Sequence, residues 1–338
     1  MKILITGGAG YIGSHTAKHL SQAGHEIVVL DNLGRGHRWA VQWGLLEEVD
    51  LLDLSAVQRT LQRHRPDAVA HFAAYALVGE SVQNPGLYYR NNFVGSLNLL
   101  EALIGSGCRK LVFSSTCAIY GNPQQPLLDE SHPQKPVNPY GQSKLMVEQA
   151  LADFATSHGL KSCALRYFNA CGADPEGELG EVHDPETHLI PSIFNALMGG
   201  QTLKLFGDQY NTPDGTCIRD YINILDLASA HRLALEALAA EKPLRAAYNL
   251  GTGRGHSVRE VIAIVETVTG RKVPVEIHPP RPGDPPSLVS SARLAQRDLG
   301  WQAEWTDLGR SVEVAWKWHQ RWFNSRLSRE PQPGPKAD

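Results

Sequence analysis

The chain has 338 residues, of which 42% are hydrophobic, and its formal net charge is -3. This hydrophobic content is near the globular average and excludes a chain that is disordered throughout, while the slightly acidic balance excludes a broad basic surface for nucleic acid. No run of about 18 apolar residues occurs, so we expect no membrane-spanning helix and no membrane partner.

Five cysteines are present, and no two of them have C-x-x-C spacing. An odd number without such spacing favours reduced thiols over a disulfide framework or a structural zinc site. The apolar run at residues 1–6 is too short for a signal peptide and is followed at once by glycines. We therefore expect a cytoplasmic protein.

Strand and helix signals alternate along the first half of the chain. Short apolar or β-branched runs predict strands at Lys2–Thr6, Glu26–Leu30, Ala68–Phe72, Lys110–Ser114 and Ser162–Arg166. Helical stretches lie between them at Tyr11–Ala23, Ala56–His64, Gly86–Ile104 and Tyr140–His158. This alternation predicts an α/β fold with a doubly wound parallel sheet.

The character of the sequence changes after Phe168. Residues 169–184 are rich in glycine, proline and acids, which predicts a long loop. Later signals predict helices at Leu189–Met198, Ile224–Ala239 and Ser257–Val268 and strands near Leu203–Phe206 and Val275–His278. We expect a first domain over 1–168, which the segment of about 218–240 can rejoin, a smaller C-terminal α/β lobe over 169–328 and a disordered tail over 329–338.

A glycine-rich turn joins the first predicted strand to the first helix. Gly7 permits a tight turn, Gly10 lets the backbone approach a pyrophosphate, and Gly13 allows close packing of the helix. Asp31 closes the second predicted strand, where a carboxylate accepts a hydrogen bond from a ribose 2′-hydroxyl and repels a 2′-phosphate. The pattern predicts NAD rather than NADP on a Rossmann-type sheet.

Further cofactor contacts are predicted around these strand ends. Asp53 follows Val49–Leu52 and can reach an adenine, although an aspartate in a loop is usually a helix cap. The small residues of Phe72-Ala73-Ala74 suit backbone beside a cofactor. The other residues predicted to bind the cofactor are Tyr11, Ile12, Asn32, Leu54, Asn92, Ser114, Tyr167 and Phe168.

Tyr140 and Lys144 lie four residues apart and share one face of a predicted helix. A free tyrosine has a pKa near 10 and is a poor base, but a nearby ammonium and a positive nicotinamide both favour the phenolate and lower that pKa. Thr116 ends a predicted strand, where its hydroxyl can bind a reacting oxygen. These residues predict redox chemistry at a carbinol carbon, with Lys144 also holding a ribose hydroxyl.

Gly7–Gly13, Asp31, Ser114–Thr116 and Tyr140–Lys144 together resemble the extended short-chain dehydrogenase/reductase family. More specific runs are similar to the UDP-glucose 4-epimerases of that family and extend the resemblance to about residue 325. They are His71-Phe72-Ala73-Ala74, Val78-Gly79-Glu80-Ser81, Arg166-Tyr167-Phe168-Asn169, Thr187-His188-Leu189-Ile190-Pro191 and the run from Thr212 to Tyr221.

The resemblance implies a NAD-dependent epimerisation at C4 of a UDP-hexose, such as UDP-glucose or UDP-galactose, in a homodimer. In that family NAD stays bound, a tyrosine removes the 4-hydroxyl proton as hydride leaves C4, and the 4-keto sugar turns over before hydride returns. The resemblance assigns Tyr140 as the base, Lys144 as the partner that lowers its pKa, Thr116 as the hydroxyl at O4 and Asn92 as support on the cofactor side.

The resemblance also implies a site for the UDP part of the substrate. It places Asn169, Arg219 and Arg281 on the diphosphate, and arginine offers a diphosphate a planar fork of donors. It places Phe206 beside uracil and Asp284 on the uridine ribose. The full set of substrate-binding residues is Thr116, Tyr140, Asn169, His188, Leu189, Leu205, Phe206, Arg219, Tyr221, Arg281 and Asp284.

Two departures from the family leave the sugar open. Ala76 stands where some members have a lysine near the cofactor. Leu288 falls near the gate of the sugar pocket, where a bulky aromatic residue excludes an N-acetyl group. A UDP-N-acetylglucosamine or UDP-xylose 4-epimerase therefore remains an alternative.

Two more distant alternatives are disfavoured by particular residues. A 4,6-dehydratase of this family has Asp-Glu directly after the active-site threonine, whereas Cys117-Ala118 follow Thr116 here. A non-catalytic NAD-sensing protein typically lacks the tyrosine and lysine. His183, Asp184 and His188 form no helical H-x-x-x-H pattern, so no metal site is predicted.

Overall fold

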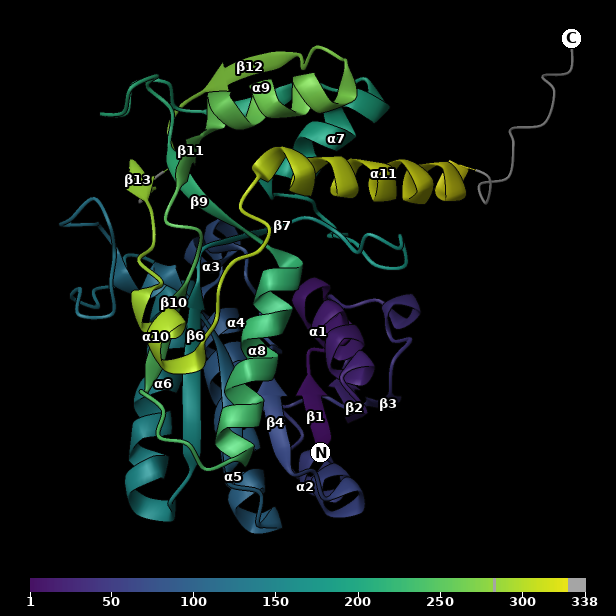
Figure 1. Cartoon of the computed structure of the whole chain (residues 1–338), viewed down its shortest axis with the longest axis vertical. Helices are drawn as coiled ribbons and strands as arrows, with labels where there is room; N and C mark the ends of the chain where they lie inside the picture. The colour runs from purple at the N-terminus through teal and green to yellow at the C-terminus, as the bar shows by residue number, and fades with distance from the viewer. Residues whose placement is uncertain (282–283, 328–338) are drawn as a thin grey trace, which may run out of the picture.

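The computed structural model describes residues 1–281 and 284–327, and its largest element is a seven-stranded parallel sheet (Figure 1). The strand order is β10-β6-β5-β4-β1-β2-β3, which is the doubly wound α/β arrangement that the sequence predicts. The strands are β1 (Lys2–Thr6), β2 (Glu26–Asp31), β3 (Leu45–Glu48), β4 (Ala68–His71), β5 (Lys110–Thr116), β6 (Lys161–Tyr167) and β10 (Ala247–Leu250).

Two layers of helices cover the sheet because successive residues of each strand point to opposite faces. On β1, Ile3 and Ile5 pack toward α1 (Tyr11–Gln22) and α8 (Ile224–Ala239), whereas Leu4 packs toward the opposite layer. That layer contains α2 (Leu54–His64), α5 (Gly95–Ser106) and α6 (Pro139–His158). The shorter helices are η1 (Arg38–Ala40), α3 (Val78–Gln83), α4 (Pro85–Tyr88), η2 (Tyr89–Val94), η3 (Cys117–Tyr120) and α10 (Arg293–Leu299).

A smaller part of the molecule lies beyond the end toward which β1 runs in Figure 1. Its strands form two small sheets, β11-β9-β13 with β7 on β9, and β8 with β12. The elements are β7 (Asn169–Cys171), α7 (Leu189–Gly199), β8 (Leu203–Phe206), β9 (Ile218–Asn223), β11 (Gly255–Ser257), α9 (Val258–Thr269), β12 (Val275–His278), β13 (Ser287–Leu288) and α11 (Leu308–Leu327). Phe194 and Trp316 belong to its own apolar core.

The chain returns to the large sheet after β9. Helix α8 lies against α1, and β10 pairs in parallel with β6 at the edge of the sheet. The division of the chain into lobes at residue 168 stays a prediction, and the predicted tail, 329–338, lies outside the described residues. Among the described helices, none has both the length and the apolar character needed to cross a bilayer.

The helix predicted at Gly86–Ile104 is interrupted by the π-helical segment η2. Asn92 lies in this segment with its side chain buried, where it bonds both the N–H and the carbonyl of Tyr75, at 2.8 and 3.0 Å. A π turn inserts one residue into a helix and so redirects the side chains around it. Sequence periodicity does not reveal this because the flanking turns remain helical.

A buried ion pair fixes α6 to the sheet. Arg166 on β6 donates from Nε to both carboxylate oxygens of Glu148 on α6, at 3.0 and 3.2 Å, and from Nη1 to the hydroxyl of Tyr120, at 3.0 Å. The side chains of Arg166 and Glu148 are only 5% and 10% exposed. Because Glu148 follows Lys144 by one helical turn, this pair also positions the predicted catalytic residues.

Replacement of Glu148 by alanine is expected to lower the free energy of unfolding by about 3–5 kcal/mol, because it leaves the Arg166 guanidinium buried without a counter-charge. Denaturant unfolding measures the change. The matched control is Glu313→Ala on α11, which breaks an exposed ion pair with Lys317 and is expected to cost about 0–1 kcal/mol. Equal losses for the two variants would contradict the role given to the buried pair.

Candidate active site

The glycine turn between β1 and α1 leaves no room for side chains. A Cβ on Gly7, whose φ is +72°, would lie 2.5 Å from the amide nitrogen of Ala73, and a Cβ on Gly13 would lie 2.2 Å from the carbonyl oxygen of Gly7. Gly10 precedes α1 and provides no side chain to cap it. The first-turn N–H groups of the helix are therefore free to bind a phosphate.

Asp31 ends β2 next to this turn. Its carboxylate accepts from the amides of Ala9, at 3.0 Å, and Leu33, at 2.8 Å, and burial raises its pKa despite these bonds. The nearby Arg35 is paired with Glu80 at 2.7 Å, and Arg38 is paired with Glu48. Because each arginine is paired with an acid, the end of β2 suits the ribose 2′-hydroxyl of NAD better than the 2′-phosphate of NADP.

Other predicted cofactor residues lie around the same end of the sheet. Ala73 is the second residue after β4 and lies beside Gly7. Asn32 donates to Asp50 at 2.9 Å, and Asp53 caps α2 by accepting from the amide of Ala56 at 2.9 Å. Asp53 therefore has the helix-capping role that is usual for a loop aspartate.

Helix α6 brings Tyr140 and Lys144 to the carboxyl end of β5. Asn138 caps the helix, since its side chain accepts from the amide of Gly141 at 2.8 Å. The buried Nζ of Lys144 donates to the carbonyl of Ser114 at 2.8 Å and lies 4.8 Å from the ring centroid of Phe113. Burial lowers the pKa of Lys144 to about 7.

The phenol of Tyr140 does not have the lowered pKa that we expected from its lysine neighbour. Burial raises its pKa to about 12, and the hydrogen bond with Thr116 opposes this only in part. Lys144 bonds the Ser114 carbonyl, and its own positive charge is disfavoured by burial. The protein's own groups therefore keep this phenol protonated at neutral pH.

Several side-chain contacts that hold this geometry were not found from the sequence. His71 connects β1 to α5, because its Nδ1 hydrogen-bonds the Thr6 hydroxyl at 2.6 Å and its Nε2 that of Ser96 at 2.7 Å. Burial lowers the pKa of His71 to about 3, so the ring is neutral. Asn92 donates to the hydroxyl of Ser143, at 3.1 Å, between the two predicted catalytic residues of α6. Long-range pairs of this kind carry no local sequence signal.

The strand next to β5 contributes two aromatic residues predicted to bind the cofactor. The hydroxyl of Tyr167 on β6 hydrogen-bonds that of Ser114 across the sheet, and burial raises the pKa of Tyr167. Phe168 is buried in a cluster with Cys117 and Leu145. Tyr11, at the start of α1, donates to the carbonyl of Gly172 at 2.7 Å, so the glycine turn is connected to the loop after β7.

The residues predicted for the UDP part lie on the smaller sheets and the segments around them. Arg219 on β9 is 9% exposed and ion-pairs with Asp284, while Asn169 on β7 is opposite Tyr221 on β9. The guanidinium of Arg281 lies 4.1 Å from the ring centroid of Phe206. Leu205 is buried in β8, His188 precedes α7 and Leu189 begins it.

Leu288, the predicted gate residue, is opposite Arg219 in the β13–β9 pairing and packs against the cluster that contains Cys117 and Phe168. Leu288 is therefore a neighbour both of the cluster that contains Cys117, the residue after Thr116, and of Arg219, which is predicted to bind the diphosphate. Ala76, the other departure, is exposed.

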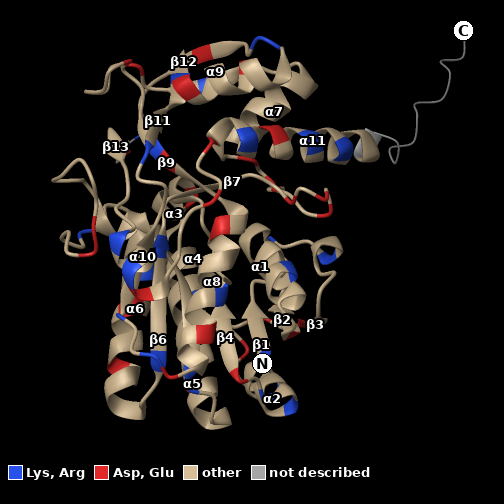
Figure 2. Ribbon diagram, in the orientation of Figure 1, with Lys and Arg blue, Asp and Glu red and all other residues tan. Residues whose placement is uncertain are grey.

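Charged residues of both signs are interspersed along the ribbon in Figure 2, in keeping with the net charge of -3. One close group was not expected. Glu181, His183, Glu186 and His188 bring their ligand atoms within 4.8 Å of one another, whereas Asp184 is not part of the group. The sequence showed the two histidines but not that two glutamates would join them.

Comparison with known proteins adds to this geometry. The profile of the NAD dependent epimerase/dehydratase family matches residues 3–251. The UDP-glucose 4-epimerase of Rhizobium meliloti (strain 1021) is 48% identical over 94% of this chain and 97% of its own length.

Solved structures similar to this chain also include those of UDP-glucose 4-epimerases. The UDP-glucose 4-epimerase of Brucella ovis, in complex with NAD, is 50% identical with a TM-score of 0.90, over 94% of this chain and 97% of that one. The enzyme of Bifidobacterium longum, in complex with NAD+ and UDP, is 35% identical with a TM-score of 0.91, over 96% of this chain and 99% of that one.

Proposed function

Because the chain belongs to the NAD dependent epimerase/dehydratase family, we propose that it inverts C4 of a UDP-hexose and interconverts UDP-glucose and UDP-galactose. The observation that carries this function is the 48% identity to a UDP-glucose 4-epimerase over 94% of the chain. The chain is an NAD-dependent enzyme, and the resemblance inferred from its motifs is confirmed.

The residues around the glycine turn fit NAD. A Cβ at Gly7 or Gly13 would meet backbone atoms, so the backbone itself is the binding surface for a pyrophosphate. The Asp31 carboxylate, held by two amides, is available to a ribose hydroxyl. Lys144, Tyr167 and Phe168 would lie toward the nicotinamide end, with Asn92 supporting the position of α6.

When bound, NAD would supply a reversible hydride acceptor for C4 of the sugar, so that the sugar could pass through a transient 4-keto form. Tyr140 takes the proton from O4 in the forward half of the reaction and gives it back in the second. Thr116 holds O4 and the phenol through its hydroxyl. Because burial raises the pKa of Tyr140 to about 12 despite the hydrogen bond with Thr116, the positive charge of an oxidised nicotinamide would have to supply most of the stabilisation of the phenolate.

The UDP part would be bound by the smaller sheets. Arg219 and Arg281 face the diphosphate, and Arg219 exchanges part of its pairing with Asp284 for phosphate oxygens. Asp284 then accepts from the uridine ribose, Phe206 lies against uracil, and Asn169, Tyr221, His188, Leu189 and Leu205 complete the pocket. This assigns the nucleotide sugar to a lobe over 169–328 and NAD to the lobe over 1–168, rejoined by the segment 218–240.

We also propose a cytoplasmic homodimer. The five cysteines are all buried and unpaired, as suits a reducing compartment. Val78, Val82, Leu87 and Val94 are each more than 40% exposed on α3, α4 and η2. Exposed apolar residues gathered on neighbouring elements are typical of a protein interface, and light scattering of the purified chain measures its mass.

The function is tested by incubating the purified chain, with no added cofactor, with UDP-glucose and UDP-galactose and separately with UDP-N-acetylglucosamine and UDP-xylose. We expect interconversion of the first pair, because NAD stays bound through each turnover. Faster turnover of the N-acetyl sugar would favour the alternative that Leu288 leaves open. No interconversion of any of them would overturn the proposed activity.

A further inference from the structure

The loop between β7 and α7 contains a group of potential metal ligands apart from the catalytic residues. The Nδ1 atom of His183 lies 3.3 Å from a carboxylate oxygen of Glu186 and 3.6 Å from one of Glu181. The Nδ1 atom of His188 hydrogen-bonds Glu181, and the two imidazole rings are 4.8 Å apart between centroids. Four side chains thus converge on one point from a stretch of eight residues.

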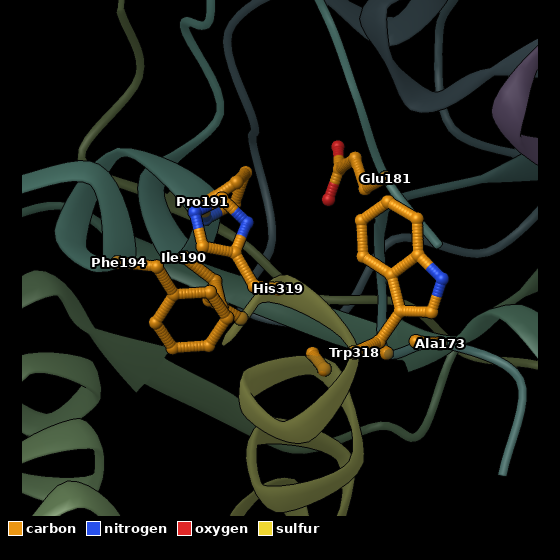
Figure 3. A pocket seen from close by; sticks show the side chains of 9 residues that line it. Ala173, Glu181, Ile190, Pro191, Phe194, Trp318 and His319 are labelled. Carbon is orange, nitrogen blue, oxygen red and sulfur yellow. The ribbon is translucent and has the colours of Figure 1, made fainter. Parts of the chain in front are cut away.

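The carboxylates in this group are oriented by the surrounding structure. One oxygen of Glu186 accepts from the amides of Thr187 and His188, each at 2.9 Å, which leaves its other oxygen facing His183. Glu181 is 8% exposed and lines a pocket whose wall includes Trp318 and His319 of α11 (Figure 3). The ligand atoms are therefore preorganised at little cost in side-chain freedom.

We propose that Glu181, His183, Glu186 and His188 form a structural binding site for a divalent transition metal, with Zn²⁺ as the ion that suits it best. Two imidazole nitrogens and two carboxylate oxygens are ligands that Zn²⁺ accepts, and four protein ligands complete a closed tetrahedral shell. In the metal-bound form the two imidazoles are neutral and the two carboxylates carry a charge of −2, which the ion neutralises. No reaction is assigned to this site, because four protein ligands leave no coordination position for water or a substrate.

A second cluster of acidic side chains in the chain surrounds a lysine. Asp174, Glu176 and Glu178 surround the Nζ of Lys18, at 2.9 Å for Asp174 and 2.7 Å for Glu178. The ammonium already occupies the place of a cation there. At the proposed site, the ion pairs of Glu181 and Glu186 within the described residues are with histidines alone. Burial lowers the pKa of His188, but Glu181 and Glu186 outweigh both burial and the charge of the nearby Arg281, so this pKa is raised to about 9.

The site would fix a glycine- and acid-rich loop to the first turn of α7. His188 precedes this helix, and Ile190 and Pro191 in its first turn line the same pocket as Glu181 (Figure 3). Binding of the ion to the folded chain alone would stabilise the folded state by linkage. If the proposed function also holds, the loop presents His188 and Leu189 to the nucleotide, and loss of the ion would raise KM more than it lowers kcat.

The experiment uses the full chain without a histidine tag, stripped with EDTA and titrated with Zn²⁺ in a calorimeter. We expect one ion per chain and a rise in Tm. His183→Gln and Glu181→Gln should weaken binding by more than about 100-fold, beyond the loss caused by removing a supporting hydrogen bond. The matched control is Glu178→Gln in the cluster around Lys18, which should bind Zn²⁺ as the unaltered chain does. Circular dichroism and NAD content check that each variant is folded.

Substitution with Co²⁺ provides a readout that does not depend on the variants. A tetrahedral site with nitrogen and oxygen ligands gives a visible absorption band without the thiolate charge-transfer band of cysteine ligands. No saturable binding, a thiolate band, or an equal loss in Glu178→Gln would each overturn the proposal. Because these readouts need no turnover, they remain valid if the assigned activity fails.

Discussion

Tyr140→Phe is expected to lower kcat by about 10² to 10⁴-fold while the chain keeps its NAD, because the phenol is the only proposed group that exchanges a proton with O4. The variant removes one oxygen atom from a half-buried residue and leaves the contact of its ring with Tyr88 in place. Steady-state epimerisation of UDP-galactose measures the loss, and absorbance of the denatured supernatant measures retained NAD.

The matched control for this prediction is Tyr89→Phe, a half-buried position one turn before Asn92 with no assigned part in the reaction. It should keep its turnover. A Tyr140→Phe variant with more than about one tenth of the normal kcat would remove Tyr140 from the role of base, because general-base catalysis contributes at least about 10²-fold.

A pH titration tests the source of the phenolate. Without NAD, the phenol should titrate at about 12, since burial raises its pKa, and binding of oxidised NAD should move that pKa downward. Lys144, whose pKa burial lowers to about 7, loses its charge as the pH rises through that value and then supports the phenolate less. Tyrosinate absorbance, compared between the unaltered chain and Tyr140→Phe, measures the shift. No change on adding oxidised NAD would contradict the proposed role of the nicotinamide charge.

Gly13→Val is expected to yield a chain that retains no NAD and has no measurable turnover. A Cβ at this position would lie 2.2 Å from the carbonyl oxygen of Gly7 and 2.8 Å from the Cα of Gly8. Both are backbone atoms of the turn that would bind the pyrophosphate, so they cannot move aside as a flexible side chain would. The helix has to shift away from β1, and the phosphate-binding amides shift with it.

The control for the glycine prediction is Gly105→Ala in α5, where an added Cβ meets nothing within 4 Å. It should keep NAD and gain stability of about 1 kcal/mol, because alanine favours a helix. NAD content after gel filtration and the unfolding midpoint distinguish the two variants. Stoichiometric NAD in Gly13→Val would show that the turn is not the pyrophosphate site.

Local signals in the sequence were sufficient for most of the large sheet. The boundaries predicted for β1, α1, α8 and α6 agree with the structure to within about a residue or two, because hydrophobic periodicity and glycine or proline at the ends define such elements. The strands β3, β7, β9, β10, β11 and β13 were missed. Their existence depends on pairing with distant partners.

Which side chains meet, and in what state of charge, was decided by tertiary structure. The spacing of Tyr140 and Lys144 placed them on one helix face, and the pattern of Gly7, Gly10 and Gly13 placed a nucleotide at the first turn. Burial raises the pKa of Tyr140 in the chain without cofactor, and folding of the loop brought two glutamates to His183 and His188. Residue type and spacing are local properties that a sequence contains in full, whereas desolvation and long-range contacts arise only when segments far apart in the chain pack together.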